Sequence, residues 1–131
     1  MKHVLDASAL MTYLEKEPGY EKIKVAFAQA AEKGERLFMN IVNWGEVYYV
    51  LARDYDLEKV EEILRIVETF PIECVRPDKE LTQQAAWYKA IRKLPYVDSH
   101  AAALAKIQKC ELMTADKDFK LVERDIKILW L

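Results

Sequence analysis

The stretch that most constrains the fold is residues 3–10 (HVLDASAL), in which a short apolar run ends at a single carboxylate, Asp6. Small residues follow Asp6, and a helix-like apolar pattern begins at Leu10. This pattern is typical of a buried parallel strand that ends in a polar turn and is followed by a helix. Asp6 is then either the N-cap of that helix or a functional group at the carboxyl end of a strand, where α/β sheets bind ligands.

Strand-like and helix-like segments alternate along the rest of the chain. Short apolar runs predict further strands at residues 37–39, 72–75, 112–114 and 126–131. Periodic apolar residues predict helices at residues 7–15, 20–32, 41–54, 57–70, 79–93 and 98–109, with a short helical stretch at 119–122. Alternation of this kind is typical of a parallel sheet covered by helices on both faces. We therefore predict one domain over residues 1–131, with a three-layer α/β/α fold and a central parallel sheet of about five strands.

The composition is that of a globular protein, with 52% hydrophobic and 32% charged residues. No apolar run approaches the roughly 20 residues of a membrane span, and Asp6 interrupts any signal-peptide pattern, so we expect no membrane association. Cys74 and Cys110 lie in apolar surroundings without CxxC spacing, which predicts reduced core residues in a cytoplasmic protein. The net charge of −2 argues against nucleic-acid binding, unless several acids are gathered in one metal site.

Three further acids occupy positions comparable to that of Asp6. Asp116 follows the strand at 112–114, and Asp118 lies two residues after it. Glu46 lies in the first turn of the helix that follows the 37–39 strand, and Asp98 begins an alanine-rich helix. Each has a capping explanation. Asp116 can cap the short helix after it, Asp98 is favoured by the helix dipole, and Glu46 stands three residues after Asn43, as in a capping box.

The four acids taken together favour a different interpretation. The first and fourth strands can be neighbours where the strand order reverses, which would bring Asp6 and Asp116 together, with Glu46 and Asp98 at the same edge. Carboxylates in so small a space repel one another and raise one another's pKa values, and a cation would neutralise them. All-oxygen ligands with room for water favour Mg²⁺ or Mn²⁺ over zinc.

Four segments (VLDASAL, NWGEVYYVL, VDSHAAALAK and LMTADKDF) together resemble the PIN-domain family, in particular the VapC-like ribonuclease toxins. The resemblance covers essentially the whole chain, in the right order. It implies that the metal-binding and catalytic acids are Asp6, Glu46, Asp98 and Asp116, with Asp118 as an accessory ligand and with Ser8 and Thr114 beside them. One departure is Pro95, where related sequences often carry a polar residue.

The resemblance also implies an activity and partners. A site of this kind supports Mg²⁺- or Mn²⁺-dependent hydrolysis of RNA phosphodiester bonds. The protein would be the toxin of a type II toxin–antitoxin pair, and a VapB-like antitoxin would place its tail in the groove of the site. Two alternatives are a Mg²⁺-binding receiver-like signalling module, in which Glu46 and Asp98 have no role, and a catalytically weak RNA-binding PIN scaffold, against which the full acid set argues.

Two other groups of residues each allow two interpretations. Lys89, Arg92 and Lys93 end the helix that precedes Asp98, where they either complement the helix C-terminus or bind RNA phosphates. The helix at 41–54 and the residue after it carry more aromatic surface than one core face needs: Trp44, Tyr48, Tyr49 and Tyr55. These side chains either pack in the core or form a protein interface. We predict a symmetric homodimer through this helix, around Tyr48 and Tyr55, or through the helix at 57–70.

Overall fold

Five parallel strands form the centre of the structure, a computed structural model that describes residues 2–131. The strands are β1 (His3–Leu5), β2 (Leu37–Asn40), β3 (Ile72–Val75), β4 (Glu111–Thr114) and β5 (Ile128–Trp130). Their order is β3-β2-β1-β4-β5, so β1 pairs with both β2 and β4. The first and fourth strands are therefore neighbours, as predicted. Receiver-type sheets have the order 2-1-3-4-5, so the strand order argues against the receiver-like alternative.

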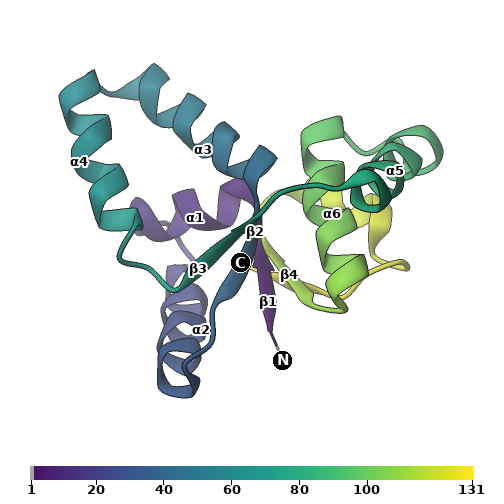
Figure 1. The fold of residues 1–131 in the computed structure, drawn as a ribbon, viewed down its shortest axis with the longest axis horizontal. Coiled ribbons are helices and arrows are strands. Elements are labelled where there is room, and N and C mark those ends of the chain that lie inside the picture. Colours follow the sequence, from purple (N-terminus) through teal and green to yellow (C-terminus); the bar gives the residue numbers. More distant parts are fainter. Residues whose placement is uncertain (1) are drawn as a thin grey trace.

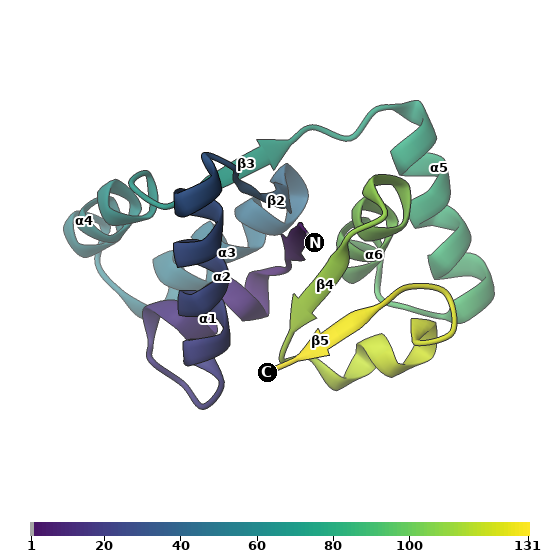
Figure 2. The same ribbon diagram turned by 90° about the horizontal axis from the view of Figure 1, so that it is seen from below.

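Helices cover both faces of the sheet (Figure 1). They are α1 (Ala7–Leu14), α2 (Tyr20–Lys33), α3 (Ile41–Asp54), α4 (Leu57–Val67), α5 (Lys79–Trp87) and α6 (Tyr96–Gln108), with a π-helical turn η1 (Tyr88–Arg92) and a 3₁₀ segment η2 (Lys117–Val122). Helices α1 to α4 lie on one side of the strands and α5 and α6 on the other, and Figure 2 shows the same separation from below. The predicted three-layer α/β/α fold is confirmed.

The core consists of two apolar clusters, one on each face of the sheet. Val4 and Leu112 lie in the cluster with α5 and α6, whereas their neighbours Leu5 and Met113 lie in the cluster with α1 to α4. Successive residues of a strand point to opposite faces, so a strand that is apolar at every position needs a cover on both sides. The alanines at 101–103 of α6 are fully buried, which lets this helix approach the sheet closely.

Local sequence explains where most helices begin. Asp6 caps α1, accepting a hydrogen bond from the Ala9 amide at 2.8 Å. The cap of α3 is Asn40, whose side chain accepts from the Val42 amide at 2.9 Å, so the assignment of Asn43 as an N-cap is wrong. The start predicted for α6 is also wrong, because the helix begins at Tyr96 and Asp98 lies inside its first turn.

Several other boundaries differ from the sequence prediction. The helix predicted at 79–93 is α5 followed by the π-helical turn η1, and it ends at Lys93, which has a left-handed backbone. Cys110 is buried, as predicted, but Cys74 is exposed because it lies in β3, at the edge of the sheet. Within residues 2–131, no helix combines the length and the apolar character needed to cross a membrane.

Candidate metal centre

Three aspartates meet beyond the carboxyl end of β4. Asp98, Asp116 and Asp118 each place one carboxylate oxygen within 4.8 Å of the oxygens of the other two. Asp98 comes from the first turn of α6, whereas Asp116 follows β4 and caps η2 by accepting from the Asp118 amide at 2.9 Å. The capping role predicted for Asp116 is therefore real, and it leaves the second oxygen of that carboxylate without a capping bond.

Asp6 lies beside this group and is held by hydrogen bonds on both of its oxygens. Its side chain is buried and accepts from the Thr114 hydroxyl at 2.6 Å, the Ser8 hydroxyl at 2.8 Å and the Ala9 amide at 2.8 Å. Ser8 in turn accepts from the Ala115 amide, and Thr114 accepts from the Asp116 amide, both at 3.0 Å. Ser8 and Thr114 therefore connect Asp6 to the backbone that carries Asp116.

The acids act on one another electrostatically. The pKa of Asp98 is raised to about 7, mainly by burial and then by the nearby charges of Asp116, Asp6, Glu46 and Asp118. Burial also raises the pKa of Asp6 to about 6, although the hydrogen bonds from Thr114, Ala9 and Ser8 oppose the rise. Burial and then Asp116 raise the pKa of Glu46. Asp98 therefore lies within reach of the charges of the other four acids, and Asp116 within reach of Asp6 and Glu46.

The donor set fits a divalent cation that prefers oxygen ligands. The five acids offer only carboxylate oxygens, and none of them takes part in an ion pair with a basic side chain within residues 2–131. The negative charge is therefore not compensated by the chain. Carboxylate ligands without nitrogen or sulfur suit Mg²⁺ or Mn²⁺.

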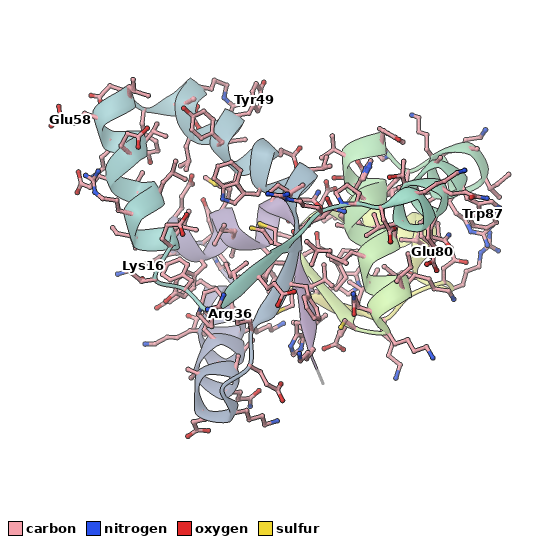
Figure 3. All side chains as sticks on the ribbon, in the orientation of Figure 1. Lys16, Arg36, Tyr49, Glu58, Glu80 and Trp87 are labelled. Carbon is pink, nitrogen blue, oxygen red and sulfur yellow. The ribbon has the colours of Figure 1, made fainter. Side chains whose placement is uncertain are left out.

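The basic residues near the end of η1 have partners of their own or face solvent. Arg92 forms a two-pronged ion pair with Asp125, at 2.9 and 3.0 Å, and lies 5.0 Å from the centre of the Trp87 ring. Figure 3 shows Trp87 on the opposite side of the molecule from Tyr49 of α3. Lys89 and Lys93 are exposed. Binding of RNA by these three basic residues stays a prediction.

The sequence did not predict two features of the structure around α3. Asn40 and Asn43 donate hydrogen bonds from the start of α3 to backbone carbonyls of α6. An apolar groove of about 410 Å³ lies between α1, α2, α3 and α4. The sequence pattern predicts only a capping role for Asn43 and none for Asn40, and a groove between helices has no local sequence pattern.

Comparisons with known proteins assign the chain to a family. Residues 3–125 match the model of the PIN domain, so this chain belongs to the PIN-domain family. A search of curated protein sequences found no significant match.

Several solved structures share the fold. One is VapBC2 from Rickettsia felis bound to a DNA fragment from their promoter, with 16% identity over 98% of each chain and a TM-score of 0.78. Another is DNA-bound VapBC from Salmonella typhimurium, with 18% identity over 98% of this chain and 97% of that chain and a TM-score of 0.75. VapC20 from Mycobacterium tuberculosis, described as a sarcin-ricin loop cleaving toxin, has 14% identity over 91% of this chain and 93% of that chain and a TM-score of 0.66. The predicted PIN domain with a VapC-like fold is confirmed.

Proposed function

We propose that this protein is a divalent-metal-dependent endoribonuclease that hydrolyses RNA phosphodiester bonds and acts as the toxin of a type II toxin–antitoxin pair. The observation that carries the proposal is the meeting of Asp98, Asp116 and Asp118 beside the buried Asp6, in a PIN-domain fold. The description of VapC20, which shares the fold, as a loop-cleaving toxin gives further support.

Mg²⁺ or Mn²⁺ is the cofactor that this donor set would hold. In our proposal the metal-binding and catalytic residues are Asp6, Glu46, Asp98 and Asp116, with Asp118 as an accessory ligand. When bound, such a cation supplies an activated water and neutralises charge on the phosphate. The carboxylates would otherwise repel an RNA backbone, so their neutralisation is also required for substrate binding.

The chain's own residues prepare the site in two ways. Three donors fix the Asp6 carboxylate in one orientation, because the Thr114 and Ser8 hydroxyls and the Ala9 amide all point at it. The Asp98 carboxylate is partly protonated near neutral pH, since its pKa is about 7. Binding of a cation therefore displaces a proton from the acid group, and acidification should weaken cation binding.

A VapB-like antitoxin is the protein partner that we propose, and the apolar groove is where we place its helix. The groove is lined by Met11, Leu14, Tyr20, Tyr55, Ile63 and Ile66, among others. Ile66 is 50% and Tyr55 41% exposed, which leaves apolar surface for a partner helix to cover. The solved structures from Rickettsia felis and Salmonella typhimurium are complexes described as VapBC, which supports a partner of this class. A homodimer is part of the proposal as well.

The test is cleavage of a total small-RNA pool by the purified protein, with Mg²⁺, with Mn²⁺ or with EDTA. We expect endonucleolytic cleavage with either cation and none in EDTA. Asp6→Asn should lose most of the activity yet remain folded, because asparagine caps a helix about as well as aspartate. The matched control is Asp56→Asn, which replaces the N-cap of α4 outside the acid group and should cleave like wild type.

Two results would reject the proposal. Cleavage that persists in EDTA, or in Asp6→Asn at ordinary Mg²⁺ concentrations, would rule out this metal centre as its source. RNA binding without cleavage under all metal conditions would favour the catalytically weak scaffold.

A further inference from the structure

Two buried asparagines connect the first turns of α3 and α6. The Nδ2 of Asn40 donates to the carbonyl of His100 at 3.3 Å, and the Nδ2 of Asn43 donates to the carbonyl of Val97 at 3.1 Å. Neither asparagine is exposed to solvent. Asn40 is the N-cap of α3 and Asn43 lies three residues further along, in the first turn, while the two acceptors are three residues apart on α6. The helices are therefore joined at two successive turns.

These hydrogen bonds lie next to acids of the candidate metal centre on both helices. Glu46 follows Asn43 by three residues and so projects from nearly the same side of α3. Asp98 follows Val97 directly in α6. Helices α3 and α6 cover opposite faces of the sheet (Figure 1). The Asn43 bond thus fixes the distance between two acids that no shared secondary structure holds together.

The choice of asparagine at position 43 carries an energetic penalty. Within residues 2–131, its Oδ1 is a buried side-chain atom that has no hydrogen-bond partner. A buried acceptor without a partner opposes folding, and a leucine, which has the same branching but no polar atoms, would avoid that penalty. Packing between α3 and α6 therefore does not account for the residue type. The residue type is explained instead by the donor Nδ2, which reaches the first turn of α6.

We propose that Asn43, supported by Asn40, is a positioning residue that keeps Glu46 near Asp98 and Asp116, so that Glu46 can join the cation that these acids would hold. The inference rests on the proposed function. Without a cation, the charges of Glu46, Asp98 and Asp116 repel one another, and this repulsion tends to separate α3 from α6. The two hydrogen bonds oppose that separation, so Glu46 stays near the other acids before a cation arrives.

The test compares Mn²⁺ affinity, measured by titration calorimetry, with the melting temperature in EDTA. Asn43→Leu removes the donor and also the unpartnered acceptor and keeps the branching of the side chain, although leucine is larger. We expect a melting temperature in EDTA close to that of wild type, because loss of the unpartnered acceptor offsets the strain of the larger side chain. We expect Mn²⁺ affinity to fall by about tenfold or more, as is usual when residues that orient metal ligands are removed. The Mn²⁺ concentration needed for half-maximal RNA cleavage should rise by the same factor.

A second variant and a control complete the experiment. Asn40→Ser retains an oxygen that can cap α3 but removes the donor to His100, and it should weaken Mn²⁺ binding in the same direction. This variant decides the question if Asn43→Leu does not fold. The control is Ser99→Ala, because the buried Ser99 hydroxyl donates to Leu94 and Pro95 and makes no bond to α3. Its Mn²⁺ affinity should match that of wild type.

The outcomes separate this inference from the proposed function. Wild-type protein that neither binds Mn²⁺ nor cleaves RNA rejects both. Wild-type binding and cleavage, with unchanged Mn²⁺ affinity in Asn43→Leu and Asn40→Ser, reject only the positioning role. A lower melting temperature in EDTA at unchanged Mn²⁺ affinity would mean that the asparagines serve stability alone, which also overturns the inference.

Discussion

Replacing Asp98 by asparagine should stabilise the metal-free protein while abolishing its activity. Asp98→Asn keeps the shape of the side chain and removes one of the charges that meet beyond β4. Asp98 lies inside the first turn of α6 and is not its N-cap, so the substitution removes no capping hydrogen bond. The favourable interaction of its charge with the helix dipole is lost, which is worth about 0.3–1 kcal/mol at most positions.

The size of the gain follows from the pKa of Asp98. The pKa of Asp98 rises from the ordinary value of 3.8 to about 7, so its ionised carboxylate destabilises the folded state by at most about 4 kcal/mol. This figure is a net value that already includes the favourable interactions of the charge. Asp98 is only partly buried and solvent screens its charge, so we discount this to roughly 1–2 kcal/mol. For a chain of this length, that gain corresponds to a melting temperature higher by about 3–8 °C.

The effect should depend on pH in a defined direction. Because the pKa in the folded state lies above that in the unfolded state, the folded protein binds the proton more tightly between about pH 4 and 7. Wild type therefore loses stability as the pH rises through this range, whereas Asp98→Asn lacks this contribution. The advantage of the variant should be largest above pH 7 and should disappear near pH 4.

Thermal unfolding in EDTA between pH 4 and pH 8 measures this difference, with Asp56→Asn as the control that should match wild type throughout. Adding Mn²⁺ should then raise the melting temperature of wild type more than that of Asp98→Asn, since binding to the folded state adds about 2.7 kcal/mol at a hundred times the dissociation constant. If Asp98→Asn melts at or below wild type in EDTA at pH 8, and Mn²⁺ shifts neither protein, the reasoning about crowded carboxylates is wrong.

Two further predictions concern the rest of the chain. Gly19→Ala should lower the melting temperature, because Gly19 has φ +99° and an added Cβ would lie 2.9 Å from the backbone carbon of Leu131. Gly45→Ala should raise the melting temperature. Gly45 lies inside α3 with open space around it, and glycine in a helix is about 1 kcal/mol less favourable than alanine. Equal shifts in the two variants would contradict this account. Light scattering at tens of micromolar should show a dimer, and a Tyr48→Asp substitution should weaken it. A monomeric wild type would refute the predicted interface, because an interface of standard size would hold at such concentrations.

Sequence alone predicted the features that repeat locally and missed those that depend on a distant partner. The placement of Asp6 near Asp116 followed from one topological argument, that strands one and four are neighbours at the reversal of strand order. The sequence pattern placed the cap of α3 at Asn43, and only the structure shows that β2 continues through Asn40, which is the cap, and that Asn43 lies inside the helix. The partner of Arg92 lies 33 residues away, so no helical pattern could reveal it.

The hydrogen bonds at the acid group divide it into two kinds of carboxylate. Asp6 accepts from Thr114, Ser8 and the Ala9 amide, so most of its acceptor capacity is taken up by the protein. Asp98 accepts no hydrogen bond from the part of the chain that the structure describes, and its pKa is raised by burial and by like charges alone. A carboxylate with free lone pairs in a crowded cleft gains most from a cation, whereas one that already accepts three hydrogen bonds gains less. We therefore expect most of the free energy of cation binding to come from Asp98 and Asp116, with Asp6 as a ligand that the protein has already oriented.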